Sequence, residues 1–175
     1  MKTLILYHSK TGFTAQYAQW LAQDLSCACV PYKSRKAISL DTFDAIAFGS
    51  GLRAGIIPGA KWFFSQVPKL EGKRLALFFT GAMPPDPAGI ERAVQQNVPP
   101  EARERVPAFY LWGGLNYEKM GFVDKAMMAA FRKMLGAKKN PTPEDQEAIR
   151  MVASSFSKAD RETLRELESY LREGK

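Results

Sequence analysis

The stretch TLILYHSKTGFTAQYAQWLA, residues 3 to 22, places an apolar run directly before a short polar loop and an amphipathic segment. The apolar run, Thr3 to Tyr7, has the length of a strand. The large apolar residues of the following segment recur at three- and four-residue spacing, as they do on one face of a helix: Phe13, Tyr17, Trp20, Leu21 and Leu25. A strand that runs through a loop into an amphipathic helix is the repeating unit of a parallel α/β sheet.

Similar apolar runs recur along the chain, with helix-like segments between them. The further runs are Cys27 to Pro31, Ala45 to Gly49, Arg74 to Thr80 and Ala108 to Trp112. Helices are predicted over Ala60 to Val67, Pro87 to Gln96, Lys119 to Leu135 and Ser157 to Glu173, and another is predicted to start at Thr142–Pro143. This alternation predicts an α/β fold: a doubly wound five-stranded parallel sheet with helices on both faces.

The composition fits one globular domain. The chain has 175 residues, 46% of them hydrophobic, which is enough material for a buried core. No apolar window is long enough to span a bilayer and the N-terminus lacks the pattern of a secretion signal, so we expect a cytosolic protein. Two cysteines, Cys27 and Cys29, and one histidine, His8, are too few for a disulfide framework or a zinc site. We expect buried or half-buried thiols and no metal.

The loop Ser9 to Thr14 lies where an open parallel sheet binds its ligands, beyond the carboxyl end of a strand. The start of a helix offers unpaired backbone amides and the positive end of the helix dipole there, and both favour a phosphate dianion. Hydroxyl groups of the loop add donors, and Gly12 lets the backbone approach the ligand closely. The loop has neither the Walker A spacing nor the Gly-x-Gly-x-x-Gly fingerprint. A polar turn with an ordinary helix cap is the alternative.

The pattern Ser-x-Thr-Gly-x-Thr behind a strand resembles the FMN phosphate loop of flavodoxins. The resemblance implies FMN as the cofactor, with its phosphate held by Ser9, Lys10, Thr11, Gly12, Phe13 and Thr14. The loop Phe48 to Gly55 looks like the flavodoxin-like loop that wraps the flavin ring, and Phe79 to Met83 is similar to the opposite wall. These two loops imply ring contacts from Ser50, Gly51, Leu52, Arg53 and Ala54 on one edge and from Thr80, Gly81 and Ala82 on the other. A glycine-rich turn without a ligand is the alternative for the first of them.

A closer resemblance is to the bacterial flavodoxin-like protoporphyrinogen dehydrogenases. It rests on Met1 to Leu6, on Leu52-Arg53-x-Gly55, on Gly113 to Tyr117, and on Phe122-x-Asp124 with the methionine-rich, basic stretch up to Gly136. The family passes electrons from the porphyrinogen through FMN to a membrane quinone. It tends to have an aromatic residue at the position of Ala54 and an arginine at that of Asn116.

The resemblance covers residues 1–136, which we predict to be the flavodoxin-like FMN-binding domain. Residues 137–175 are predicted to be a helical extension packed on the same domain. Trp112, Gly113 and Tyr117 are predicted to border the cofactor on its substrate side, and for Trp112 a place in the core is the alternative. No catalytic side chain is assigned, because the redox chemistry belongs to the flavin.

Charge favours an anionic partner, since the chain carries a formal net charge of +7. Residues 119–139 contain six basic residues and one acid, and Met127, Phe131 and Met134 lie on another face of the predicted helix. One alternative is that a basic amphipathic helix of this kind lies on an anionic membrane surface, which would place the protein at the inner face of the membrane. The favoured interpretation is a helix that packs its apolar face on the core and leaves its basic back in solvent.

The favoured function is an FMN-dependent oxidoreductase acting on a small-molecule substrate, with a quinone or a redox protein as partner. A flavodoxin-type electron carrier without its own substrate is one alternative, although such carriers are acidic. A non-catalytic basic module that has lost flavin is another; no nucleic-acid motif is present. A hydrolase built on His8 and Ser9 is disfavoured, because adjacent strand residues point to opposite faces and no Gly-x-Ser-x-Gly elbow occurs.

Overall fold

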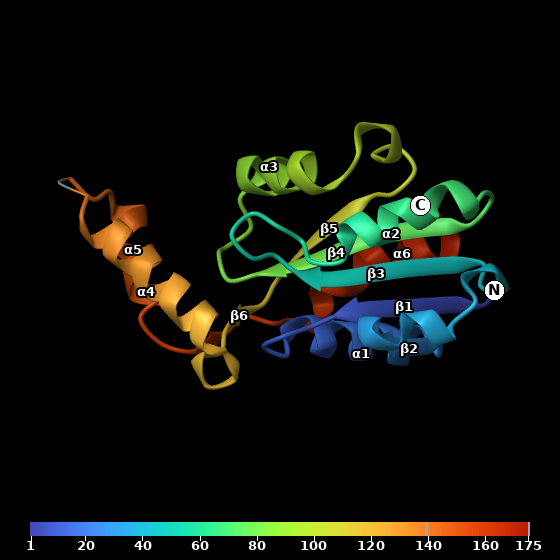
Figure 1. Cartoon of the computed structure of the whole chain (residues 1–175), viewed down its shortest axis with the longest axis horizontal. Coiled ribbons are helices and arrows are strands. Elements are labelled where there is room, and N and C mark those ends of the chain that lie inside the picture. Colours follow the sequence, from blue (N-terminus) through green and yellow to red (C-terminus); the bar gives the residue numbers. More distant parts are fainter. Residues whose placement is uncertain (139, 175) are drawn as a thin grey trace.

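A computed structural model of the chain describes residues 1–138 and 140–174. Its centre is a five-stranded parallel sheet in the order β2–β1–β3–β4–β5 (Figure 1). The strands span Thr3–His8 (β1), Ala28–Pro31 (β2), Ala45–Gly51 (β3), Arg74–Gly81 (β4) and Ala108–Trp112 (β5). All five predicted strands are confirmed, and the ends of β1, β3 and β4 reach slightly further than the sequence indicated.

Helices cover both faces of this sheet, so the predicted doubly wound α/β architecture is confirmed. On one face lie α2 (Ala60–Gln66) and α3 (Pro87–Asn97). On the other lie α1 (Phe13–Leu25) and α6 (Arg165–Glu173). Short 3-10 turns join several of these elements; one of them, η3 (Val67–Lys69), continues α2.

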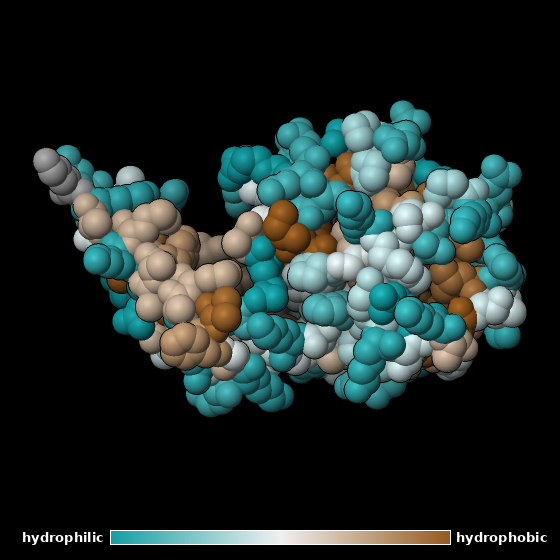
Figure 2. Space-filling model, viewed as in Figure 1, coloured by the Kyte–Doolittle hydropathy of each residue, from teal (hydrophilic) through white to brown (hydrophobic). Residues whose placement is uncertain are grey.

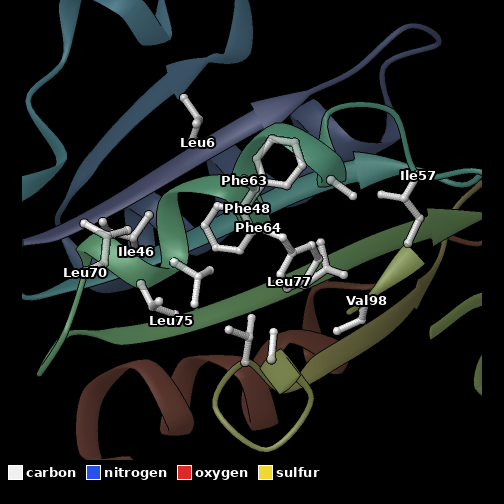
Figure 3. Close-up of a cluster of buried hydrophobic side chains, with 14 of the residues drawn as sticks. Leu6, Ile46, Phe48, Ile57, Phe63, Phe64, Leu70, Leu75, Leu77 and Val98 are labelled. Carbon is white, nitrogen blue, oxygen red and sulfur yellow. The ribbon is translucent and has the colours of Figure 1, made fainter. Parts of the chain in front are cut away.

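The two faces of the sheet carry side chains of different size. In β3 the large residues Ile46 and Phe48 point toward α2, where Phe63 stacks on Phe48 with ring centroids 5.3 Å apart (Figure 3). The small residues Ala45 and Ala47 point toward α1 and α6. Because successive strand residues face opposite sides, this alternation buries both faces of β3. Each fully buried large side chain contributes roughly 1.5–3 kcal/mol to the free energy of folding.

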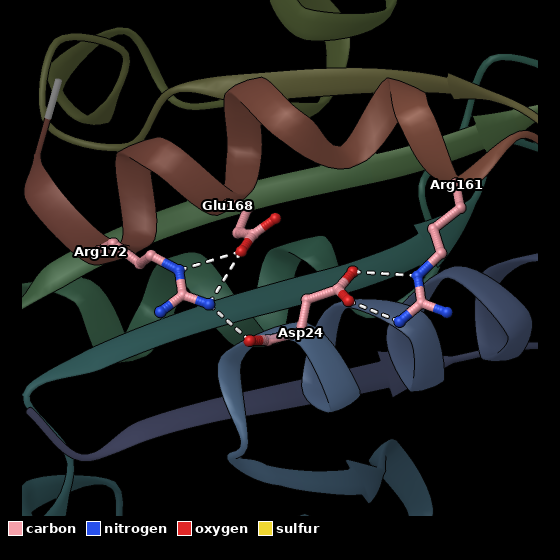
Figure 4. Close-up of polar contacts among 4 residues, drawn as sticks. All are labelled: Asp24, Arg161, Glu168 and Arg172. Atoms are coloured by element: carbon pink, nitrogen blue, oxygen red, sulfur yellow. Dashed lines mark hydrogen bonds and ion pairs between the residues drawn. The ribbon is translucent and has the colours of Figure 1, made fainter.

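Helix α6 closes the sheet beside α1. As predicted, Leu164, Leu167 and Leu171 lie together on its buried side. Figure 4 shows how polar contacts fasten the helix: Arg161 binds the carboxylate of Asp24 with two nitrogens, and Arg172 donates to the backbone oxygen of Asp24. These contacts hold the C-terminal helix against α1 on the same face of the sheet.

The predicted start of the last helix at Ser157 is wrong. Residues Phe156–Ser157 form a short strand, β7, and a 3-10 turn, η6 (Arg161–Leu164), precedes α6. The side chain of Asp160 caps this turn by accepting a hydrogen bond from the amide of Glu162, 2.9 Å away. An extended Ser157 and a capped Asp160 stop the helix from reaching further back.

Between β5 and α6 the chain leaves the sheet and forms an arm. The arm contains η5 (Tyr117–Lys119), α4 (Phe122–Gly136) and α5 (Pro143–Met151). Its base is closed by β6 (Gly114–Leu115), which pairs antiparallel with β7. Figure 1 shows the arm projecting past the end of the sheet at which the parallel strands finish. The predicted start of α5 is confirmed, because Thr142 and Asp145 form a capping box.

The favoured interpretation of the 119–139 segment, a helix packed on the core, is wrong. In α4 the side chains of Val123, Met127 and Met134 are 64%, 41% and 59% exposed. Figure 2 shows the resulting apolar surface along the arm. The reason is that α4 packs on α5 and the arm's base rather than on the sheet. Lys139, the last residue of the predicted segment, lies outside the described residues.

The predicted division of the chain at residue 136 stays a prediction. Beyond that point α5 belongs to the arm, whereas α6 packs on the sheet itself. In the part of the chain that the structure describes, no helix has the length and apolar character to cross a bilayer.

Candidate functional site

A pocket lies at the carboxyl ends of β1, β3 and β4, where the arm meets the sheet. Its volume is about 180 Å³. Ligand sites are typically roughly 300–1,000 Å³, so a large ligand has to use the open mouth as well. The lining residues are His8, Lys10, Thr11, Phe13, Thr14, Gly51, Leu52, Arg53, Ala54, Thr80, Gly81, Ala82, Gly114, Leu115, Met120, Asp124, Met127 and Met128.

The first wall of the pocket is the loop between β1 and α1. Gly12 has φ +106° and precedes α1 directly, a backbone conformation that other residues rarely adopt. Within the described residues no side chain caps this end of α1, so the amides of its first turn remain available to a ligand. The hydroxyl oxygen of Ser9 is buried and has no hydrogen-bond partner among the described residues. A buried hydroxyl without a partner is costly, and a bound anion would supply the missing acceptor.

The floor of the pocket joins the ends of three strands. The hydroxyl oxygens of Thr14 and Thr80 are 2.8 Å apart and form a buried hydrogen bond between α1 and β4. Gly51, at the end of β3, lies against the same two hydroxyls, since a Cβ there would be 3.7 and 3.8 Å from them. One buried polar contact therefore ties the first turn of α1 to the end of β4, and the end of β3 packs beside it.

The second wall is a tight turn after β3. Arg53 and Ile56 exchange two backbone hydrogen bonds of 2.8 and 2.9 Å, and between them Ala54 (φ +47°) and Gly55 (φ +81°) both have left-handed backbone conformations. Ala54 is strained there, at a cost of about 1 kcal/mol.

Asn97, at the end of α3, holds this turn in place. Its side-chain nitrogen donates to the oxygen of Gly55 at 2.7 Å, and its side-chain oxygen accepts from the amide of Ile57 at 2.8 Å. The sequence did not mark Asn97 as part of the site. A residue 42 positions from Gly55 therefore fixes the shape of the second wall.

The arm is joined to both walls of the pocket through Asp124. The Asp124 carboxylate pairs with Lys10 on the first wall and with Arg53 on the second. Burial by itself would raise the pKa of Asp124, but hydrogen bonds from Lys10 and Arg53 outweigh burial and lower it. Asp124 is thus ionised at neutral pH and ties α4 to both loops.

Comparisons with known proteins identify the family. A sequence profile described as a flavodoxin domain matches residues 4–142, which is most of the chain. The chain belongs to the flavodoxin domain family. The flavodoxin resemblance drawn from the sequence is confirmed at this level.

Solved structures similar to this flavodoxin domain are distant in sequence. A flavodoxin, WrbA-like protein from Agrobacterium tumefaciens is 16% identical, with 86% of this chain and 94% of that chain covered and a TM-score of 0.48. A flavoprotein in complex with FMN from Lactobacillus acidophilus NCFM is 17% identical (63% and 91% covered, TM-score 0.45). Oxidised flavodoxin 1 from Bacillus cereus is 13% identical (79% and 100% covered, TM-score 0.45). No curated protein sequence matches the chain.

FMN is the cofactor of the flavodoxin domain, as expected from the phosphate loop. The residues at the pocket fit this group. The partnerless hydroxyl of Ser9 and the free amides after Gly12 suit the phosphate, and the turn at Arg53 together with the floor at Gly81 suits a flat ring between two loops.

Most of the predicted site residues meet at this pocket. The structure brings together Lys10, Thr11, Phe13, Thr14, Gly51, Leu52, Arg53, Ala54, Thr80, Gly81 and Ala82. Ser9 and Gly12 belong to the first wall without lining the cavity. Ser50 turns away from it and donates its hydroxyl to the oxygen of Pro58, 2.8 Å distant.

The three residues predicted on the substrate side, Trp112, Gly113 and Tyr117, do not line the cavity either. The Trp112 indole nitrogen donates to the backbone oxygen of Ala82 at 3.0 Å, so Trp112 holds the loop that follows β4. Gly113 packs against Phe13. The hydroxyl of Tyr117 donates to the oxygen of Val152 within the arm.

Apart from His8, the lining residues that the sequence analysis did not assign come from the arm. These are Gly114, Leu115, Met120, Asp124, Met127 and Met128. The Phe122-x-Asp124 element was visible as part of the family resemblance, but nothing local showed that it faces Lys10 and Arg53.

His8 ends β1, as predicted, and also lines the pocket. Burial, followed by the nearby charge of Arg53, lowers the pKa of His8, so its imidazole is neutral at pH 7. The hydroxyl of Ser9 makes no hydrogen bond to it, which leaves a His–Ser hydrolase pair without support within the described chain.

Proposed function

We propose that this flavodoxin domain is an oxidoreductase that takes electrons from protoporphyrinogen or a closely similar reduced porphyrin and passes them to a quinone. The observation that carries the proposal is the arm, which brings Met120, Met127 and Met128 into the lining of the cofactor pocket. An electron carrier that meets only other proteins needs an open flavin edge. A covered edge with an adaptable apolar wall suits a bulky organic substrate.

The surroundings of the mouth have the same character. Phe122, Val123 and Met127 are exposed on α4, and Ile56 and Met83 are exposed on the loops that follow β3 and β4. Exposed apolar side chains around a pocket are typical of a site for an apolar ligand or a membrane surface. A porphyrinogen combines an apolar macrocycle with carboxylates, and those carboxylates find basic side chains at this mouth.

The arm also supports contact with an anionic membrane, where a quinone resides. Lys125, Arg132 and Lys133 are exposed on α4 beside its apolar surface. Basic and apolar side chains on one surface helix favour the headgroup region of anionic lipids. This peripheral contact is part of the proposal.

The chain's own residues position FMN and tune its redox properties, and FMN when bound supplies the transfer of hydride or single electrons. The Arg53 guanidinium stands at the expected ring edge, where its positive charge favours negative charge on the ring. Asp124 fixes the direction of Arg53. The neutral His8 adds no charge to the site.

The test is an anaerobic reduction. FMN-loaded protein is mixed with protoporphyrinogen IX, the bleaching of the flavin absorbance is followed, and a short-chain quinone is then added. We expect bleaching by the porphyrinogen and recovery with the quinone. An Arg53→Gln variant should need more porphyrinogen, whereas the exposed Arg92→Gln variant, with the same change of charge, should not.

Bleaching by a chemical reductant but not by the porphyrinogen would contradict the proposal. It would favour the electron-carrier alternative, whose basic surface docks on an acidic redox protein.

A further inference from the structure

Three cationic side chains gather around the first wall of the pocket: Lys10, Arg53 and Lys119. Two of them share one counter-ion, because the Asp124 carboxylate pairs with both Lys10 and Arg53. Among residues 1–138 and 140–174, Lys119 has no acidic partner within ion-pairing distance. The single negative charge of Asp124 against these three cations leaves the mouth with a net charge of +2, and Lys119 is the cation that no acid of the described residues holds.

Lys119 lies against the start of α1. A Cβ at Gly12 would be 3.4 Å from the Lys119 ammonium nitrogen. Gly12 directly precedes the first turn of α1, whose amides point out of the helix end. The ammonium thus lies beside the residue that precedes these amides, in the same loop as Ser9, whose buried hydroxyl has no partner among the described residues.

The short turn η5 holds Lys119 there. Its first residue, Tyr117, donates its amide to the Ser155 hydroxyl at 2.9 Å, and Ser155 in turn donates to the carboxylate of Glu118 at 2.7 Å. Asn116 caps the turn by accepting from the amide of Lys119 at 3.1 Å. The backbone under the ammonium is fixed by contacts that do not involve the pocket.

We propose that Lys119 is a phosphate ligand of the cofactor site, so that the arm supplies the one cation which the phosphate loop itself lacks. This inference rests on the binding of FMN at this pocket. Lys10 does not play that part, because Asp124 holds its ammonium. The site then discriminates FMN from flavins without a phosphate through a residue that comes from outside the loop.

The test compares FMN with riboflavin, which has the same ring but no phosphate, by flavin fluorescence titration at low and high salt. In a Lys119→Met variant FMN binding should weaken about two- to fivefold, the range for an exposed charged contact. Riboflavin binding should not change. The difference between wild type and variant should shrink at high salt, where exposed charges are screened.

A Lys125→Met variant is the matched control, since it removes the same charge from the exposed side of α4. It should bind both flavins like the wild type, and a Lys119→Arg variant should restore FMN binding. Unchanged FMN affinity in Lys119→Met, or an equal loss for FMN and riboflavin, would overturn the assignment of Lys119. A wild-type protein that binds neither flavin would overturn the FMN site itself, and the inference with it.

Discussion

Replacing Asp124 with asparagine tests how the pocket is closed, because this carboxylate joins the arm to both walls. Removing one partner of a fully buried ion pair costs roughly 3–5 kcal/mol. The Asp124 side chain is 9% exposed, but those of Lys10 and Arg53 are 41% and 36% exposed. Water can therefore hydrate the two released cations, and we expect a loss of about 1–2 kcal/mol in the free energy of unfolding. For a chain of this size that corresponds to a fall in Tm of about 2–8 °C.

The loss should depend on pH in a defined direction. The pKa of Asp124 is lower in the folded protein than its ordinary value: burial opposes this shift, and the hydrogen bonds from Lys10 and Arg53 exceed it. A carboxylate of this kind adds stability that is complete above its unfolded pKa of about 3.9 and is lost as the pH falls through its folded pKa. The gap in stability between wild type and Asp124→Asn should thus be constant near neutrality and close in acid.

The assay is thermal unfolding of wild type and variant between pH 7 and pH 3, with amide hydrogen exchange of α4 as the local readout. Asp86→Asn is the control. Asp86 is 62% exposed and pairs loosely with Arg92 at 3.8 Å, and asparagine can still cap α3 in its place. We expect its effect to stay within about 0.5 kcal/mol. Equal Tm values for Asp124→Asn and wild type, or a stability gap that widens in acid, would show that the ionised Asp124 carboxylate does not hold the arm to the two walls.

Three further outcomes are expected. Asn97→Ala removes the hydrogen bonds that hold the second wall, so it should lower the stability by about 1–3 kcal/mol. It should also weaken the binding of FMN and of riboflavin by the same factor in fluorescence titrations, with Gln95→Ala as the neutral control. A loss of binding confined to FMN would contradict the role of Asn97 in the second wall. Leu167→Ala, in a fully buried position, should lower the stability in urea unfolding by about 2–5 kcal/mol, and less than 1 kcal/mol would mean that α6 does not close the sheet. Burial, with Cys29 beside it, raises the pKa of the Cys27 thiol to about 11. Alkylation of Cys27 by iodoacetamide should therefore be slow at pH 8 and should accelerate as the pH rises toward that pKa.

The sheet and the first wall of the pocket were predictable because their signals are local. A strand such as β1 declares itself by a continuous apolar run, and α1 by three- and four-residue spacing. The start of α5 at Thr142 was equally readable, since a capping box needs only residues three positions apart. In a parallel sheet the loops after the strands share one edge, which brought the three predicted loops to one pocket.

The arm was not predictable in the same way. A helix with Met127 and Met134 on one side has the same sequence pattern whether that side meets a core or remains exposed. What decides is the pairing of Gly114 with Ser157, which sends the chain away from the sheet and back. A two-residue strand pair across 43 positions leaves no pattern in the sequence.

The closing contact was hidden for a related reason. Asp124 and Arg53 are 71 positions apart, and neither residue type reveals its partner. Asn97 and Gly55 show the same limit, because an asparagine near the end of a helix is ordinary until the turn beside it is known. Sequence patterns locate the loops of this site, and tertiary contacts decide which side chains complete it.

The most direct test of the FMN site is a titration of the flavin-free wild-type protein with FMN and, in parallel, with riboflavin. Binding is measured by the quenching of the flavin fluorescence. We expect stoichiometric, tight binding of FMN and much weaker binding of riboflavin, because the helix end and the hydroxyl of Ser9 suit a phosphate. Equal affinity for the two flavins, or binding of neither, would contradict the assignment of the FMN site.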